Sequence, residues 1–159
     1  MEKMLKLLET NPTLTAEQMA VMLDCTRREV AAQIDEAAAK GIIKGYRAII
    51  DWEKTGTAMV KALIELKVTP KKGRGFDEIA MAIASMDEVE GVTLMSGGYD
   101  LLVEIRARSF QEIAMFVFKR LSPMDDVNET ATHFVLRPYK QAGIIFHDEE
   151  EDERGFNSL

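Results

Sequence analysis

The stretch 76–117, FDEIAMAIASMDEVEGVTLMSGGYDLLVEIRARSFQEIAMFV, decides the fold because it contains one helical pattern twice. The first copy, FDEIAMAI, begins at Phe76, and the second, FQEIAMFV, begins 34 residues later at Phe110. Two copies are too few for a solenoid, which needs at least about three repeats. Each copy instead follows a strand-like segment, so the repeat indicates the split β-α-β halves of a ferredoxin-like sandwich.

Apolar and polar residues around this repeat alternate as they do in strands. The pattern predicts strands at 59–68, 89–97, 99–107 and 127–139, and helices at 74–86 and 109–121. This β-α-β-β-α-β order places both helices on one face of an antiparallel sheet and leaves the other face open. The predicted fold class is therefore α+β.

The open face of the predicted sheet has a mixed composition. Leu101, Val103 and Ile105 share one face of their strand, whereas Leu102 and Glu104 lie on the other. A half-apolar sheet face on a small domain often packs against a second copy of the chain. We therefore expect a homodimer that forms through this sheet.

The first fifty residues predict three short helices. Thr15 and Gln18 have the spacing of a capping box, and so do Thr26 and Glu29. The third helix therefore starts only about three residues after the second ends. Gly41 is expected to end it, since glycine favours the position after a helix C-terminus. Two helices joined this tightly have the outline of a helix-turn-helix.

The segment that follows these helices favours a strand. IIKGYRAIID, residues 42–51, is rich in β-branched and aromatic residues. A winged helix places its wing at this point. The sequence therefore predicts a strand here and a winged helix-turn-helix over the first fifty residues.

The formal net charge of −7 is unevenly distributed along the 159 residues. Residues 1–50 are net neutral, residues 51–140 carry −2 and residues 141–159 carry −5. Most of the acidity lies in the terminal stretch HDEEEDERGFNSL, which we expect to be solvated and mobile. The global charge therefore says little about the N-terminal third, which is not clearly basic either.

Composition also excludes several classes of protein. With one cysteine, Cys25, the chain has no internal disulfide framework and no multi-cysteine metal site. No apolar run could span a bilayer, and the acidic residues near the N-terminus are unlike a signal or transit peptide. The only histidines, His133 and His147, suit neither a metal site nor a catalytic triad. We expect a cytoplasmic protein without membrane contact, cofactor, metal or enzymatic activity.

Three stretches, in this order, resemble the Lrp/AsnC (feast/famine) family of transcription regulators. Residues 26–51, TRREVAAQIDEAAAKGIIKGYRAIID, look like a recognition helix followed by a turn and a GY strand. Residues 96–105, SGGYDLLVEI, look like the hairpin of the effector domain, and residues 127–136, VNETATHFVL, look like its last strand. The resemblance covers about residues 1–140.

This resemblance implies a division of the chain into four parts. We expect a winged helix-turn-helix DNA-binding domain at 1–50, a linker at 51–57, a ferredoxin-like (RAM-type) effector-binding and oligomerisation domain at 58–140, and an acidic tail at 141–159. The tail lies outside the family pattern. Family membership would also imply dimers that commonly assemble further into tetramers or octamers.

The resemblance further implies a small-molecule effector, an amino acid or a related compound, bound between effector domains of neighbouring dimers. Asp100 can accept hydrogen bonds from an ammonium group, and turn amides and threonine hydroxyls can donate to a carboxylate. The alternative is that Asp100 is an ordinary turn residue and that the threonines only form a strand. The expected effector-binding residues are Gly98, Tyr99, Asp100, Thr130 and Thr132.

The partner expected for the N-terminal domain is double-stranded DNA. Recognition helices contact base edges mainly through their N-terminal turns, where this chain has Arg27 and Arg28. Arg28 can reach guanine and Gln33 can pair with adenine, while Asp35 and Glu36 fall in the half that tilts away from the duplex. The expected DNA-contact residues are Thr26, Arg27, Arg28, Ala32, Gln33, Lys40, Lys44 and Arg47.

The function we expect is that of a sequence-specific DNA-binding regulator that responds to an amino acid. Two alternatives to this function stay open. In the first, the arginines lie on a solvated face of a capped helix, in a sensing or assembly module that has lost DNA binding. Gln33 and Ala37 favour it, because the family often has a basic residue and a leucine there. The second is an enzyme similar to the haem-pathway decarboxylases, whose histidine- and arginine-bearing stretch is not found here.

Overall fold

The computed structural model describes residues 1–57, 59–71 and 75–146, and the chain divides into two compact units, Met1–Ile49 and Ile50–Leu159. Most of the predicted acidic tail, 147–159, lies outside the described residues. Within the described part, no helix is long and apolar enough to cross a membrane.

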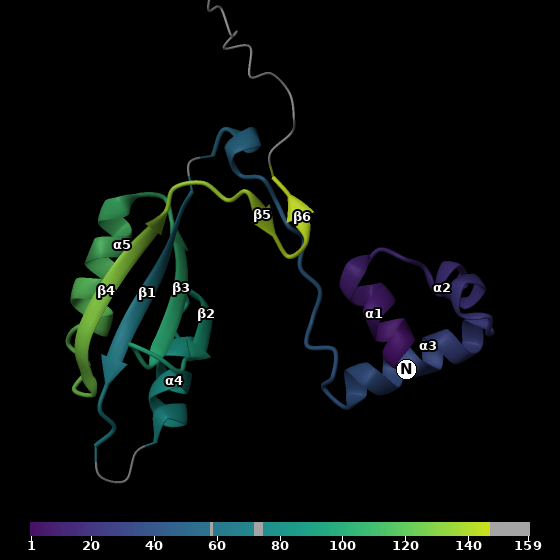
Figure 1. The fold of residues 1–159 in the computed structure, drawn as a ribbon, viewed down its shortest axis with the longest axis horizontal. Coiled ribbons are helices and arrows are strands. Elements are labelled where there is room, and N and C mark those ends of the chain that lie inside the picture. Colours follow the sequence, from purple (N-terminus) through teal and green to yellow (C-terminus); the bar gives the residue numbers. More distant parts are fainter. Residues whose placement is uncertain (58, 72–74, 147–159) are drawn as a thin grey trace, which may run out of the picture. The chain divides into compact units, whose positions relative to one another are not determined.

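The first unit consists of α1 (Glu2–Thr10), α2 (Ala16–Leu23) and α3 (Arg27–Ala39) (Figure 1). Both predicted capping boxes are present. The hydroxyls of Thr15 and Thr26 accept from the backbone N–H three residues later, and the side chains of Gln18 and Glu29 accept from the backbone N–H of Thr15 and Thr26 in turn. The three helices bury a common core of Met4, Leu8, Met19, Ala20 and Val30.

Two left-handed residues set the ends of these helices. Asp24 ends α2 with φ 51°, which lets the chain turn directly into the cap of α3. Gly41, with φ 65°, ends α3, and Ile42 N–H donates to the Ala37 carbonyl at 2.8 Å. This is a Schellman motif, so the predicted role of Gly41 is confirmed.

The strand predicted for residues 42–51 is wrong. The described residues before Val60 contain helices as their regular structure and no strand. The segment has the composition of a strand, but a strand is stable only beside another one. Within this unit nothing offers that partner, and Ile42 and Tyr46 remain more than half exposed, at 51% and 58%.

The second unit is built on a four-stranded antiparallel sheet (Figure 1). Its strand order, β2-β3-β1-β4, is that of a ferredoxin-like sandwich, the architecture that the repeat predicts. The elements, in chain order, are β1 (Val60–Val68), α4 (Phe76–Ala84), β2 (Val89–Leu94), β3 (Leu101–Ala107), α5 (Phe110–Phe116), η2 (Val117–Leu121) and β4 (Val127–Val135).

One face of the sheet carries the hydrophobic core. Ile79 and Ile83 of α4 pack with Ile113 and Phe116 of α5 against alternate residues of the two central strands. Both helices therefore cover the same face, as Figure 1 shows. The predicted alternation is confirmed, since Leu101, Val103 and Ile105 are all buried and Leu102 and Glu104 are not.

Four short elements differ from the predicted pattern. The pattern predicts one uniform helix at 109–121, but α5 continues as the π-helical turn η2. Residues Glu53–Thr55 form a 3-10 turn, η1, and β5 (Lys140–Gln141) pairs with β6 (Ile144–Ile145). Ala142 and Gly143 connect this hairpin with positive φ angles of 46° and 83°. Alanine rarely adopts such angles, so the residue pattern does not predict a hairpin here.

Candidate functional site

The residues expected to contact DNA lie on α3 and in the segment that follows it. Thr26 is the N-cap of α3, and its backbone N–H and hydroxyl both donate to Glu29 Oε2 at 2.8 Å. These hydrogen bonds, the backbone one first, lower the pKa of Glu29. Thr26 therefore positions the start of α3 and has little freedom to bind a ligand through its hydroxyl.

The two arginines at the start of α3 differ in their surroundings. Arg27 Nε lies 2.8 Å from Glu17 Oε1, an ion pair between α3 and α2 in which both side chains are well exposed. Arg28 is exposed, and no hydrogen bond or ion pair joins its side chain to the described residues. Such an exposed ion pair contributes little to stability. Arg28 is thus available to a ligand, and Arg27 is held at the same end of the helix.

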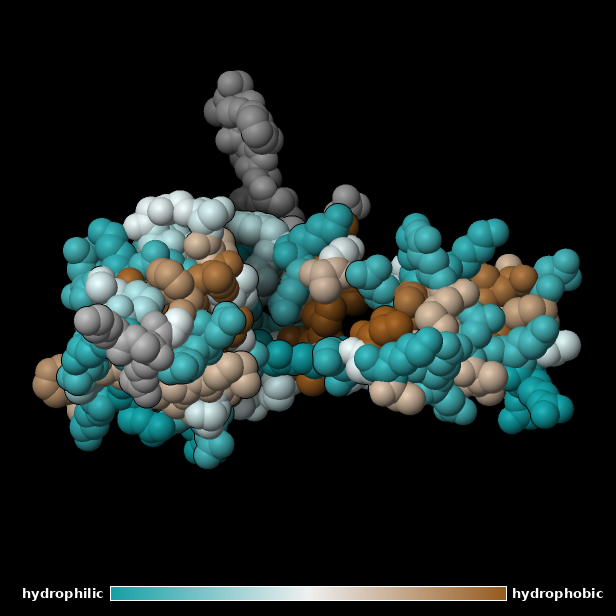
Figure 2. Space-filling model, turned by 90° about the horizontal axis from the view of Figure 1, so that it is seen from below, coloured by the Kyte–Doolittle hydropathy of each residue, from teal (hydrophilic) through white to brown (hydrophobic). Residues whose placement is uncertain are grey.

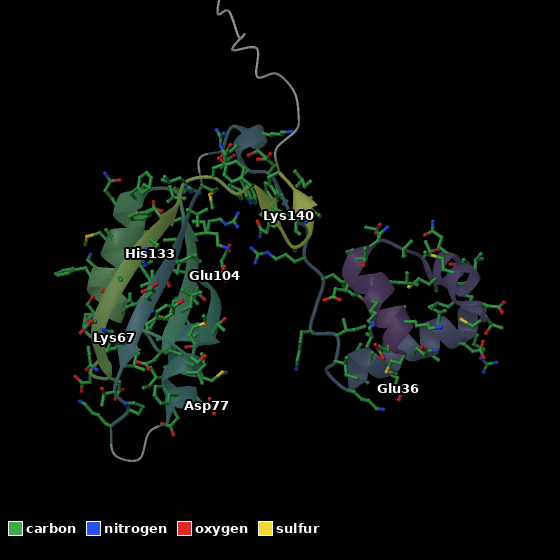
Figure 3. The ribbon with its side chains drawn as sticks, in the orientation of Figure 1. Glu36, Lys67, Asp77, Glu104, His133 and Lys140 are labelled. Carbon is green, nitrogen blue, oxygen red and sulfur yellow. The ribbon has the colours of Figure 1, made fainter. Side chains whose placement is uncertain are left out.

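The remaining candidates spread along α3. Ala32 is exposed and Gln33 is half-buried. Lys40 forms an ion pair with Glu36, whose side chain is labelled in Figure 3, and this contact lowers the pKa of Glu36. Lys40 lies about 20 Å along the helix axis from Arg27. The predicted set therefore follows one helix from end to end.

Lys44 and Arg47 lie in the irregular segment after Gly41. Both residues are exposed, and Arg47 has an interaction partner within the protein. Neither lies on a strand, so the structure does not bring them to a wing in this chain.

The proposed effector residues begin in the turn between β2 and β3. Asp100 anchors this turn, because its Oδ2 accepts from Val68 N–H at 2.8 Å and its own N–H donates to the Leu66 carbonyl at 2.9 Å. The Asp100 carbonyl in turn accepts from Met95 N–H at 2.8 Å. Asp100 therefore has a structural role, and one of its carboxylate oxygens is occupied by the backbone.

Thr130 and Thr132 lie on β4, paired with Leu66 and Ile64 of β1. They share the helix-covered face with these partners, and both are half-buried. Because β1 separates β3 from β4, Asp100 and Thr130 are two strand spacings apart, about 10 Å. The structure brings the turn and Thr130 to one end of the sheet but not into direct contact.

The same end of the sheet carries an ion pair that the sequence pattern did not reveal. Lys67 Nζ lies 2.8 Å from Glu129 Oε2, and this contact raises the pKa of Lys67. Asn128 Nδ2 donates to Thr69 Oγ1 at 2.7 Å beside it. The partners are about sixty residues apart in sequence, so only the register of β1 and β4 brings them together.

Two cavities in the second unit lie elsewhere. One, about 450 Å³, lies beside η1 and the β5–β6 hairpin and is lined by Trp52, Lys61, Arg106 and Phe146 among others. The other, about 580 Å³, lies at the far end of β3. None of the predicted effector residues lines either cavity.

Comparison with known proteins extends these observations. The model of the Lrp/AsnC ligand binding domain family matches residues 61–145. The chain is 43% identical over 153 residues to an uncharacterized HTH-type transcriptional regulator, YugG, of Bacillus subtilis (strain 168), covering 96% of this chain and 92% of that protein. It is 23% identical over 143 residues to the leucine-responsive regulatory protein of Haemophilus influenzae, covering 90% and 86%.

Solved structures show the same fold. A transcriptional regulator of Neisseria meningitidis, NMB0573, solved as a complex with L-Met, superposes with a TM-score of 0.67 at 19% identity and covers 87% of this chain and 89% of that one. AsnC of E. coli superposes with a TM-score of 0.65 at 19% identity, covering 87% and 91%. Identities this low support the fold alone.

A three-helix unit followed by a ferredoxin-like domain, with full-length relatives that are regulators, defines a ligand-responsive transcription regulator. The chain belongs to the Lrp/AsnC family. The resemblance inferred from TRREV, SGGYD and VNETATHF is therefore confirmed.

Proposed function

We propose that this chain binds specific DNA sequences through its first unit and that an amino acid, bound to its second unit, controls the binding. The observation that carries the proposal is the pair of successive capping boxes at Thr15 and Thr26. They leave three residues between α2 and α3 and place Arg27 and Arg28 in the first turn of α3. Regulation of transcription requires no catalysis, and we propose that the chain acts in the cytoplasm without enzymatic activity.

The first unit acts as a helix-turn-helix in this proposal. α3 is the recognition helix, and its N-terminal turn enters the major groove. Arg28 reads base edges, while Arg27, Lys40, Lys44 and Arg47 neutralise phosphates. Thr26 contributes by fixing where the helix begins. Residues 42–51 form no strand and follow α3 as an irregular segment.

Replacing Glu17 by glutamine is expected to strengthen DNA binding about threefold, because it removes a carboxylate that competes with phosphate for Arg27. Arg27, once released from Glu17, can contact a phosphate. The plot of log affinity against log salt concentration should therefore become steeper, by up to the equivalent of about one phosphate contact. The measurement is fluorescence anisotropy of a labelled upstream fragment across a salt series. Glu2→Gln, which breaks a matched exposed pair with Lys6, is the control. Equal gains in both variants would show only a general loss of negative charge.

The effector site lies at the β2–β3 turn. Oδ2 of Asp100 accepts from the backbone, and the carboxylate retains its charge and a second oxygen for an ammonium group. Gly98 and Tyr99 supply turn amides, and Thr130 and Thr132 supply hydroxyls from β4. Because these groups do not close a site within one chain, we propose that a neighbouring dimer completes it.

The open face of the sheet is the proposed dimer interface. Leu63, Leu102 and Val135 are half-buried there. The Lys61–Glu104 ion pair and the His133–Glu65 contact cross between strands on this face. Two of the residues in these contacts, Glu104 and His133, are labelled in Figure 3. The surface seen from below also has hydrophobic residues beside hydrophilic ones (Figure 2). Further assembly to tetramers or octamers belongs to the same proposal.

Leu63→Lys should shift the dimer toward monomer, because it places a charge among the apolar residues of this face. The new ammonium group lies opposite Glu104, its partner in the β1–β3 register, so the monomer should stay folded. Light scattering after size exclusion measures the mass. Phe118→Lys is the matched control, since Phe118 is 71% exposed on η2. An unchanged dimer in Leu63→Lys would exclude this interface.

A module that senses ligands or assembles without binding DNA is the second candidate function. The Glu17 contact to Arg27 favours it, because that contact lowers the positive charge available at the start of α3. Titration of an upstream DNA fragment with the purified protein, at increasing salt, distinguishes the two. Saturable, selective binding that weakens with salt supports the regulator. Absence of selective binding at low salt would establish the module.

A further inference from the structure

The cavity of about 580 Å³ lies at the end of the sheet where β3 ends and β1 and β2 begin. Its lining includes Met59 before β1, Glu88 before β2, and Arg106 near the end of β3. Arg106 is six residues along β3 from Asp100, about 20 Å away at the usual rise of a strand. The cavity is therefore separate from the proposed effector site.

The apolar part of this cavity is fixed by the core. Ile105 of the sheet forms part of one wall, Phe116 of α5 forms part of the other, and both residues are buried. Met59 and Met115 add flexible apolar surface. The volume lies within the range of small-molecule sites, roughly 300–1,000 Å³. The cavity can thus hold an apolar group of modest size.

The polar part of the cavity is unusually positive for an acidic protein. Four cationic side chains and two carboxylates line it, although the whole chain carries −7. Glu112 accepts from Arg108 N–H at 2.9 Å, and Glu88 lies 3.3 Å from Arg120. Both carboxylates are therefore already engaged. The cationic residues are Arg106, Arg108, Lys119 and Arg120.

Two of these cations are available to a ligand. The side chains of Arg108 and Lys119 are exposed and make no ion pair with the residues the structure describes. Arg106 is held elsewhere: its Nε lies 3.2 Å from a Glu90 oxygen, and its guanidinium group lies 6.0 Å from the ring centroid of Trp52, beside the other cavity.

We propose that this cavity is a second ligand site, for a small organic carboxylate that carries an apolar group. Arg108 and Lys119 bind the carboxylate, since a guanidinium group offers paired donors that match its two oxygens. The apolar group lies against Phe116 and Met115. A DNA phosphate would need the cations alone, whereas the apolar wall favours a small amphipathic anion.

Titration calorimetry with isocaproate tests the site on the full-length protein. We expect saturable binding, and isocaproamide, which has the same shape without the charge, should not bind. The double variant Arg108→Gln with Lys119→Gln should weaken isocaproate binding at least about tenfold, because it removes two charge-assisted contacts. Arg137→Gln, at an exposed arginine outside the cavity, is the matched control and should bind as the parent does.

Thr130→Val separates this site from the proposed effector site and should leave isocaproate binding unchanged, because isocaproate has no ammonium group for Asp100 and at that site would need the threonine hydroxyl for its carboxylate. The proposal is overturned if isocaproate does not bind at millimolar concentration, or if the double variant binds it as well as the parent. It is also overturned if Thr130→Val abolishes binding, which would place isocaproate at the proposed effector site. Loss of DNA affinity in the double variant without any isocaproate binding would make these cations phosphate contacts.

Discussion

Replacing Arg27 and Arg28 together by alanine will reduce affinity for an upstream DNA fragment by about a hundredfold. Each base-edge or phosphate contact of this kind is worth roughly 1–3 kcal/mol, and the pair begins α3 where a recognition helix meets the groove. Of the two, Arg28 should account for more of the loss, because Arg27 must first leave Glu17. Anisotropy titration of the double variant and of each single variant measures how much affinity each arginine contributes.

Such a loss has to be distinguished from damage to α3. Both arginines are exposed, and the cap of the helix depends on Thr26 and Glu29. Circular dichroism and thermal unfolding of the double variant should therefore match the parent. Lys3→Ala with Lys6→Ala removes the same charge from α1 of the same unit and should cost much less affinity. Parental affinity in the arginine variant would contradict the proposed recognition helix.

The local elements of the fold follow from patterns a few residues long. The capping boxes at Thr15 and Thr26 set two helix starts, and Gly41 set a helix end, because each acts on backbone groups within one turn. The repeat at Phe76 and Phe110 set the topology, because two similar helices after two strands have few ways to pack. These features required no knowledge of distant contacts.

Features that depend on distant partners were missed or mispredicted. Residues 42–51 have strand composition, but pairing decides whether a strand forms, and composition does not report the partner. The Lys67–Glu129 pair and the Asp100 hydrogen bond to Val68 depend on the register of the sheet. The sequence therefore indicated Asp100 as a candidate ligand residue, with a turn role as the alternative. The structure shows the turn role and leaves the ligand role to experiment.

Two substitutions of Asp100 will separate its structural role from its proposed ligand role. Asp100→Asn keeps a side-chain oxygen that can accept from Val68 N–H but removes the charge that attracts an ammonium group. We expect parental stability and effector affinity at least about tenfold weaker. Asp100→Ala removes the acceptor as well. Because Val68 is 5% exposed, its N–H would stay unsatisfied, at a cost of about 1–3 kcal/mol.

The measurements are denaturant unfolding and titration calorimetry with the amino acid that most stabilises the parent in a thermal-shift screen. Asn128→Ala serves as the control at the same end of the sheet, since it breaks only a side-chain contact to Thr69. If Asp100→Asn binds the amino acid as the parent does while Asp100→Ala is destabilised, Asp100 is a turn residue only. Weak binding in a stable Asp100→Asn protein assigns the ammonium contact to Asp100, because the fold and its turn are then unchanged.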